Sequence, residues 1–256
     1  MVDIVDGVGV HELAIPVVCF ALCAAFQGWE FLAPHKPDVA RVRDLFKDVR
    51  AGWVADNYMK GQQAVNTTRD YIRASLFFAN TAILLSTFVV GYAGGRYADC
   101  SSEDDSCNAA DWLLVIKLGV LAALLMAIFF VFTQCTRYAV HFSFCINTSE
   151  VDGVPMPMAL MVKVFNHAHK YYSLGIRLYF ATIPVFAWIF TGWALLVVTP
   201  LYVFMVRGLE NADFVQIELD EMARVKAASP PSSSSPPLPP GAAVAPQTAD
   251  SKEHAI

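Results

Sequence analysis

Residues 112–132 read WLLVIKLGVLAALLMAIFFVF, an almost wholly apolar run that only Lys117 interrupts. A helix needs about 20 mostly apolar residues to cross a bilayer whose hydrocarbon layer is about 30 Å thick. Three further runs share this character: 13–32, 74–92 and 178–206. One such run is compatible with a buried helix of a soluble protein. Four of them predict an all-α membrane protein, built as a bundle of four transmembrane helices.

The composition agrees with a membrane protein. Hydrophobic residues make up 56% of the chain and charged residues only 16%, whereas roughly a quarter of the residues in soluble domains are charged. The net charge of -5 excludes a strongly basic nucleic-acid binder, so no nucleic-acid partner is expected. Segment 1–12 contains acidic residues but no Lys or Arg, unlike a cleaved signal peptide, which starts with positive charge. We therefore expect this segment to precede a retained first span.

The first and fourth apolar runs are less regular than the other two. Gln27 and Glu30 lie near the inner end of the first run, which makes it the weakest of the four. The fourth, 178–206, contains Pro184 and Pro200 and is long enough to tilt or kink. Proline is tolerated in a membrane helix because neighbouring helices can satisfy the freed carbonyl groups. We expect this run to form a single span.

Positive residues predict the orientation. Lys and Arg concentrate in 33–73 and 133–177, whereas the loop between spans two and three has Arg96 against acidic residues such as Asp99 and Asp111. Positive residues prefer the cytoplasmic side of a membrane. The two basic stretches are therefore predicted to be cytoplasmic and the acidic loop to lie outside. Both termini would then lie on the non-cytoplasmic side of a plasma or internal membrane.

Two cysteines, Cys100 and Cys107, flank a short polar stretch of the loop that we place outside. Disulfides form and persist in oxidising compartments. The pair therefore predicts a disulfide between these two residues. The alternative is two free thiols in a reducing space.

The cytoplasmic stretches have helical patterns of their own. Apolar residues recur at helical spacing from Val42 to Trp53, with charged residues on the other side, which predicts an amphipathic helix at about 41–54. This helix either lies on the membrane surface or packs on the cytoplasmic ends of the bundle, and its mixed charge favours packing. Polar helices are expected to extend the spans inward over 56–73, 134–144 and 159–177, with a turn at Asp152-Gly153.

The C-terminal segment 227–256 is rich in Pro and Ser and has almost no bulky apolar residue. Such a segment cannot bury enough surface to fold, so a disordered tail is predicted. The tail is either a docking or phosphorylation segment that uses Ser232 to Ser235, or simply a solvated end. The membrane domain is accordingly expected to cover 13–226.

Several segments are distinctive in their order and spacing: GQQAVNTTRDYIRAS at 61–75, HFSFCINT at 141–148, YSLGIRLYFATIPVFAWIF at 172–190 and NADFV at 211–215. Together they resemble the domain of unknown function 599 family, although Thr191-Gly192 stands where that family usually has Gly-Pro. The resemblance implies a multi-span membrane protein, found in bacteria and plants, with no assigned activity. The positions that carry it are Asn66, Arg69, Gly175, Arg177, Tyr179, Pro184, Trp188 and Asp213.

Positive residues at the inner ends of the predicted spans are the candidate binding residues. Cations at a membrane boundary are costly to bury and need partners. They predict a site for an anion or a lipid headgroup on the cytoplasmic rim. The alternative is that these side chains reach the interface and only set the topology. The residues are Arg69, Arg73, Arg137, Lys170 and Arg177.

No set of residues predicts catalysis, a metal or a cofactor. His167 and His169 would point about 200° apart on a regular helix, so they do not chelate one metal. The predicted spans lack paired carboxylates, a nucleophile with a base, and a metal cluster. We therefore expect a protein that is not an enzyme.

Three classes of function remain. The first is a structural or interaction protein, such as an accessory subunit of a membrane complex, with membrane lipids and another protein or a second copy as partners. The second is a homo-oligomeric anion channel or transporter whose second span lines the path through Asn80, Thr81, Ser86 and Thr87. Such residues more often form hydrogen bonds between helices. The third is a membrane-embedded lipid enzyme, which has the least support.

Overall fold

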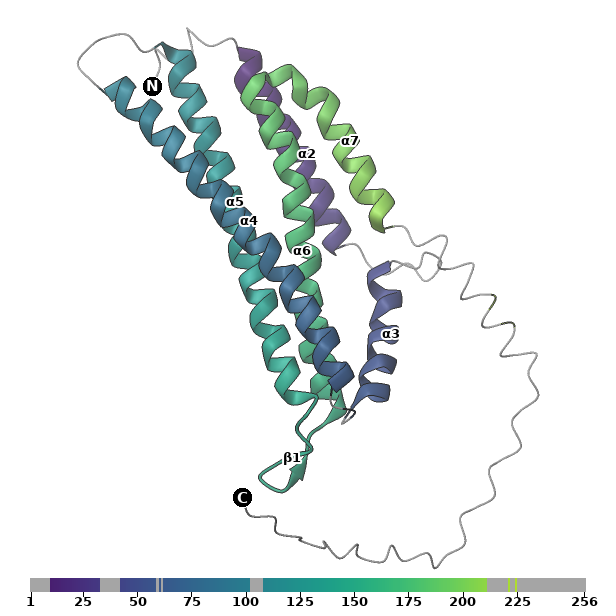
Figure 1. Cartoon of the computed structure of the whole chain (residues 1–256). Coiled ribbons are helices and arrows are strands. Elements are labelled where there is room, and N and C mark those ends of the chain that lie inside the picture. Colours follow the sequence, from purple (N-terminus) through teal and green to yellow (C-terminus); the bar gives the residue numbers. More distant parts are fainter. Residues whose placement is uncertain are drawn as a thin grey trace, which may run out of the picture. The chain divides into compact units, whose positions relative to one another are not determined.

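The computed structural model describes residues 10–32, 42–58, 60, 62–101, 108–210, 221 and 224. The chain divides into two units, 1–213 and 214–256, and the elements below all belong to the first. The predicted disordered tail, 227–256, lies outside the described residues. The elements in chain order are α2 (Val10–Leu32), α3 (Val42–Asn57), α4 (Gln62–Ser101), α5 (Ala109–Cys145), β1 (Glu150–Val151), β2 (Val154–Pro155), α6 (Met158–Phe190) and α7 (Gly192–Glu210) (Figure 1).

Three of the described helices, α4, α5 and α6, are long and apolar enough to cross a membrane. Shorter apolar stretches lie in α2, at Ala14–Phe26, and in α7, at Gly192–Gly208. The second and third predicted spans thus fall within α4 and α5. The first falls within α2. The all-helical fold class predicted from the sequence is found, and a membrane-spanning protein agrees with these helices.

The prediction of a single fourth span over 178–206 is wrong. Helix α6 ends at Phe190, Thr191 has an extended backbone (φ −163°, ψ 147°), and α7 begins at Gly192. Helix α7 then runs back beside α6 (Figure 1). The two prolines do not make the break, because Pro184 lies inside α6 and Pro200 inside α7. In the described part of the chain, three long apolar helices and two shorter ones therefore replace the predicted bundle of four.

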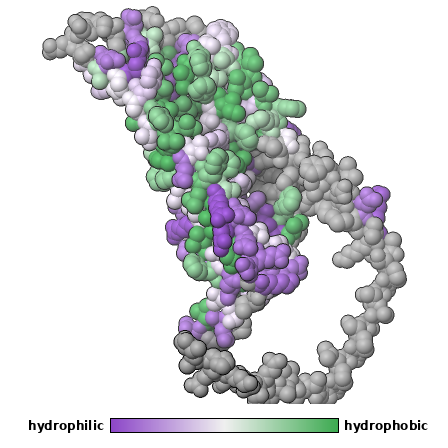
Figure 2. All heavy atoms as spheres, viewed as in Figure 1, coloured by the Kyte–Doolittle hydropathy of each residue, from purple (hydrophilic) through white to green (hydrophobic). Residues whose placement is uncertain are grey.

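The long helices reach well beyond the thickness of a membrane. Helix α4 has 40 residues, α5 has 37 and α6 has 33. At about 1.5 Å per residue, α4 is roughly 60 Å long, twice the hydrocarbon thickness. Figure 2 shows hydrophobic surface gathered over the half of the bundle that contains α7, and hydrophilic surface around α3. We call these the apolar half and the polar half.

Aromatic side chains fill the centre of the bundle. Phe132 of α5 stacks on Phe78 of α4, with 5.2 Å between ring centroids. Gly175 of α6 lies directly against Phe132: a Cβ atom at position 175 would be 2.7 Å from the ring. Because glycine lacks that atom, α6 approaches α5 closely here. The packing continues into the apolar half through Ile128 and Val185.

Helix α3 packs against the polar half of the bundle. Val54 is fully buried there, and the Trp53 ring lies 6.3 Å from Phe142 of α5 and 5.7 Å from Phe165 of α6. The Arg50 Nε–H donates to the Asn166 side chain at 2.8 Å. Of the two arrangements considered for the amphipathic helix, packing on the bundle is the one found.

Two connections of the polar half differ in detail from the sequence expectations. Helix α4 begins at Gln62 rather than near Asp56, because the Lys60 amide donates to the Asn57 carbonyl in a turn that follows α3. The predicted Asp152-Gly153 turn joins the short strands β1 and β2. Both turn residues have positive φ, 52° and 76°, as a tight two-residue hairpin turn requires.

Candidate functional site

The positive residues predicted to form one rim site lie on three different helices. Arg69 and Arg73 of α4, Arg137 of α5 and Lys170 of α6 are exposed. Arg73 pairs with Asp70, with 3.5 Å between Nη1 and Oδ1, but both side chains are well exposed. Arg177 of α6 lines a cavity.

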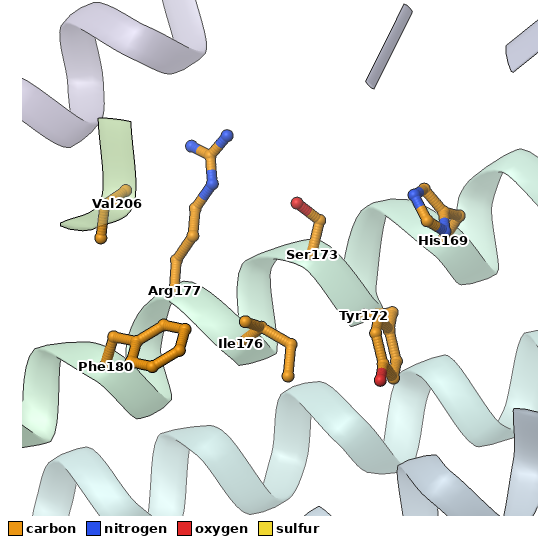
Figure 3. A pocket seen from close by; sticks show the side chains of 7 residues that line it. All are labelled: His169, Tyr172, Ser173, Ile176, Arg177, Phe180 and Val206. Carbon is orange, nitrogen blue, oxygen red and sulfur yellow. The ribbon is translucent and has the colours of Figure 1, made fainter. Parts of the chain in front are cut away.

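The cavity has a volume of about 230 Å³ and lies along α6. His169, Ser173 and Arg177 follow one another at intervals of four residues, so they share one face of the helix. Figure 3 shows the Ser173 hydroxyl and the Arg177 guanidinium extending to the same side of α6. A cation, a hydroxyl and an imidazole thus lie in a row on the cavity wall.

The rest of the cavity wall is mainly apolar. Helix α6 contributes Tyr172, Ile176 and Phe180, and α7 contributes Val206. Gly175, which rests on Phe132, places this site at the level where the third predicted span ends. The cavity therefore lies at the boundary between the apolar and polar halves.

A second polar cluster, in the apolar half, joins distant parts of the chain. The Lys117 ammonium of α5 lies 3.1 Å from the Glu12 carboxylate of α2, and the two side chains are only 6% and 19% exposed. The same carboxylate accepts hydrogen bonds from the Gly192 amide at 3.1 and 3.3 Å and from the Thr191 hydroxyl at 3.4 Å. We call Glu12, Lys117, Thr191 and Gly192 the carboxylate cluster.

The carboxylate of Glu12 provides a partner for two polar groups, the Lys117 ammonium and the Gly192 amide. A lysine within an apolar stretch needs a partner of opposite charge, and the first amides of a helix lack partners inside that helix. The negative carboxylate is also stabilised by the positive end of the helix dipole at the N-terminus of α7. The Trp188 ring lies 5.5 Å from the Lys117 Nζ atom, which adds a cation–π contact. The arrangement fixes the turn between α6 and α7 to α2 and α5.

Sequence reasoning missed the carboxylate cluster because Glu12 was assigned to the segment before the first span. The signal that could have found it was Lys117 itself. An ionisable residue in the middle of an apolar run implies a carboxylate nearby in space.

The polar residues of the second predicted span have different surroundings. Thr81 and Thr87 donate to carbonyl groups of their own helix, Phe77 at 2.8 Å and Ile83 at 2.9 Å. Ser86 donates across to the Ala122 carbonyl of α5 at 3.2 Å, as expected for a hydroxyl between membrane helices. Asn80 is exposed on α4.

The positions that carry the family resemblance take several roles. Tyr179 packs edge-on against Phe78, with 5.6 Å between ring centroids. Pro184 and Trp188 are buried in α6, whereas Asn66 and Arg69 are exposed on α4. Asp213 lies outside the described residues.

Of the two cysteines predicted to pair, Cys100 lies at the end of α4 and is described. Cys100 is disulfide-bonded, while Cys107 lies outside the described residues, so the pairing of these two residues stays a prediction. As for metals, within the described part of the chain no three His, Cys, Asp or Glu residues lie close enough together to hold an ion.

Comparison with known proteins identifies one family. A family model described as "Protein of unknown function, DUF599" matches residues 14–215. No curated protein and no solved structure matches the chain.

Proposed function

Because the chain belongs to the DUF599 family, whose description names no activity, we propose a function from its surfaces. We propose that it is a non-catalytic integral membrane protein, a structural or interaction subunit of a membrane complex. The matched region, 14–215, contains nearly all of the apolar helical sequence. Its partners are membrane lipids and a protein that binds within the membrane.

We propose that α2 and α7 cross the membrane together with α4, α5 and α6. The basic residues then place the polar half, with α3, on the cytoplasmic side. Since α7 runs back beside α6, its end at Glu210 returns to the cytoplasmic side as well. This arrangement replaces the expectation that the C-terminal end lies outside, and it keeps the start of α2 outside.

The observation that carries the interaction role is the position of Asn80. Leu76, Asn80, Leu84 and Thr87 follow at helical spacing and are all exposed, so they form one outer face of α4. Placing an amide in hydrocarbon without a hydrogen-bond partner is unfavourable, because the group gives up its hydrogen bonds to water. Asn80 is about 9 Å beyond Ala74, where the apolar run begins, at about 1.5 Å per residue. A short side chain at that depth favours a partner helix over water.

The channel alternative draws on the same face of α4, since only several copies could form a path there. Against a path lined by this helix, the hydroxyls of Thr81, Ser86 and Thr87 already donate to backbone carbonyls. The centre of a single bundle is filled by Phe78 and Phe132. An interaction surface therefore explains the exposed amide with fewer assumptions than a pore does.

The test is native mass spectrometry of the full-length protein, extracted gently from its own membrane, with two matched variants. Asn80→Leu removes the amide of the outer face. Asn66→Leu makes the same change on an exposed position of α4 in the polar half. A hydrogen bond between membrane helices contributes about 0.6 to 2 kcal/mol. We expect Asn80→Leu to weaken the complex by about threefold to thirtyfold and Asn66→Leu to leave it intact.

The composition of the complex separates the two roles. One copy bound to other proteins, lost in Asn80→Leu, supports the accessory subunit. A closed ring of identical copies with bound anionic lipid supports the channel, and ion flux in reconstituted vesicles would then be measured. Recovery of the wild-type protein as a lone monomer, or equal behaviour of both variants, would contradict an interaction role for this face.

A further inference from the structure

The cavity on α6 has a polar wall and an apolar wall that suit one kind of ligand. We infer that it holds the phosphate group of an anionic membrane lipid. The inference rests on the cavity and, for the leaflet that the cavity faces, on the orientation proposed above. It is independent of the outer face of α4, because no residue of that face lines the cavity.

The polar wall fits a phosphate group. A guanidinium binds phosphate oxygens through two parallel N–H donors, and Arg177 presents its guanidinium at the cavity. Ser173, one turn away on the same face, supplies a hydroxyl donor, and His169 lies one further turn along. Donors from two successive turns, Ser173 and Arg177, can contact different oxygens of one phosphate.

The apolar wall distinguishes a lipid from a soluble anion. Ile176, Phe180 and Val206 lie beside the polar row. A free phosphate would gain nothing from these side chains, whereas the glycerol and the first methylene groups of a lipid would bury against them. A cavity of about 230 Å³ is too small for a whole lipid. The acyl chains would therefore extend along the apolar half outside the cavity.

The level of the cavity in the bundle is the level of lipid headgroups. The apolar run of α6 begins at Leu178, immediately after Arg177, and Lys170 lies exposed on the other side of the site, toward the polar half. In the orientation proposed above, this level faces the cytoplasmic leaflet. Anionic lipids in that leaflet attract basic protein segments.

The test compares lipids retained by the full-length protein in native mass spectrometry after exchange into equal mixtures of phosphatidylglycerol and phosphatidylcholine. Arg177→Gln removes the guanidinium, Arg177→Lys keeps the charge without the paired donors, and Ser173→Ala removes the hydroxyl. Arg137→Gln is the matched control, since Arg137 is exposed on α5 outside the cavity. Because Arg177→Gln removes hydrogen bonds between two charged groups, it should lower phosphatidylglycerol retention about tenfold or more.

Arg177→Lys and Ser173→Ala should lower phosphatidylglycerol retention by less than Arg177→Gln does. Arg137→Gln should leave this retention unchanged. Should Arg177→Gln fail to give monodisperse protein, the other two cavity variants decide. Equal losses in the cavity variants and in Arg137→Gln would overturn the inference, because they would show attraction by the basic rim as a whole. Unchanged retention in all the variants would overturn it as well.

A second arm separates the two sources of a phosphate group. Inorganic phosphate is added at millimolar concentration, and the thermal unfolding midpoint is measured for the wild-type protein and for Arg177→Gln. Stabilisation by phosphatidylglycerol alone, lost in Arg177→Gln, supports the lipid. Equal stabilisation by inorganic phosphate would overturn the lipid assignment in favour of a soluble phosphate ligand at the same residues.

Discussion

At the scale of single residues, the contact between Glu12 and Lys117 joins α2 to α5 beside the turn between α6 and α7. Burying a charge is costly, so removing one partner of a buried pair leaves the other uncompensated. Glu12 also holds the first amide of α7 through Gly192. By contrast, the pair formed by Arg96 and Asp111 has side chains 39% and 28% exposed, so solvent screens much of its attraction.

Substitution of Lys117 by Met should destabilise the protein by about 3 kcal/mol or more, because Glu12 loses its counter-charge in an apolar environment. Adding Glu12→Gln should recover most of this loss, since a neutral amide can still accept from Gly192. Arg96→Gln, at the more exposed pair, should cost about 1 kcal/mol or less. Thermal unfolding in detergent measures all three variants. A double variant no more stable than Lys117→Met would contradict this account.

Two glycines predict opposite effects of the same substitution. Gly175→Ala would bring a Cβ atom within 2.7 Å of the Phe132 ring, and overpacking of this kind costs about 1 to 3 kcal/mol. At Gly119, inside α5, an added Cβ atom would meet no neighbouring atom within 4 Å. Gly119→Ala should therefore stabilise the helix by about 0.5 to 1 kcal/mol. An unfolding midpoint that stays unchanged or rises in Gly175→Ala would refute the close approach of α6 to α5.

At the scale of elements, α3 shows what the spacing of apolar residues can predict and what it leaves open. The spacing of apolar residues predicts a helix, but the same face could bind either lipid or protein. The structure resolves the choice because Trp53 meets aromatic rings from two other helices, Phe142 and Phe165. These partners lie far away in sequence, so no local pattern reveals them.

Substitution of Trp53 by Ala should loosen α3 from the polar half. Loss of a large aromatic side chain from a packed cluster costs about 3 kcal/mol. Hydrogen exchange measured by mass spectrometry should therefore speed up across 46–57. Phe46→Ala, on the same helix where the ring is 40% exposed, is the control and should change exchange little. Faster exchange in Phe46→Ala than in Trp53→Ala would instead indicate a helix held by the lipid surface.

The elements that the sequence predicted well are those with long, uninterrupted patterns. The runs 74–92 and 112–132 fall inside α4 and α5. The break at Thr191 was missed because apolar residues continue on both sides of it, and the prolines lie elsewhere. What holds the break is the contact with Glu12, which is a long-range interaction. Strands β1 and β2 have two residues each, too few to leave an alternating pattern.

At the scale of the whole molecule, the reversal at Thr191 decides on which side α7 ends. Membrane-impermeant maleimide labelling in intact cells tests this, with variants that each add one cysteine to the chain. Asn108→Cys should be labelled outside, while Glu150→Cys and Gly208→Cys should be labelled only after permeabilisation. All three positions are exposed. The background is the labelling of the unsubstituted chain. If both Gly208→Cys and Asn108→Cys were labelled above it in intact cells, the C-terminal end of α7 would lie outside, as the sequence predicted.

The distribution of Lys and Arg along the chain predicted the position of Arg177 but not the cavity that it lines. The excess of Lys and Arg at the inner ends marked the rim that contains Arg177, but it marked Arg69 and Arg137 equally. Which of them faces a cavity depends on helix rotation and on α7, whose direction the apolar pattern did not give. Ser173 and His169 join Arg177 only because intervals of four residues share a helix face, a relation that could have been tested on the sequence.

The contact between Glu12 and Gly192 also has a consequence in time. These residues are 180 positions apart, and at about 5 to 20 residues per second a ribosome needs roughly 10 to 40 seconds to make the intervening chain. During the earlier part of that interval, neither Lys117 nor α7 has been made. During the later part, Lys117 is present but α7 is still missing. In the membrane arrangement proposed above, α2 is therefore inserted before the residues that pack against Glu12 have been made. Docking of α7 onto α2 is therefore a late step of folding, and variants of the carboxylate cluster should reduce the amount of protein that accumulates.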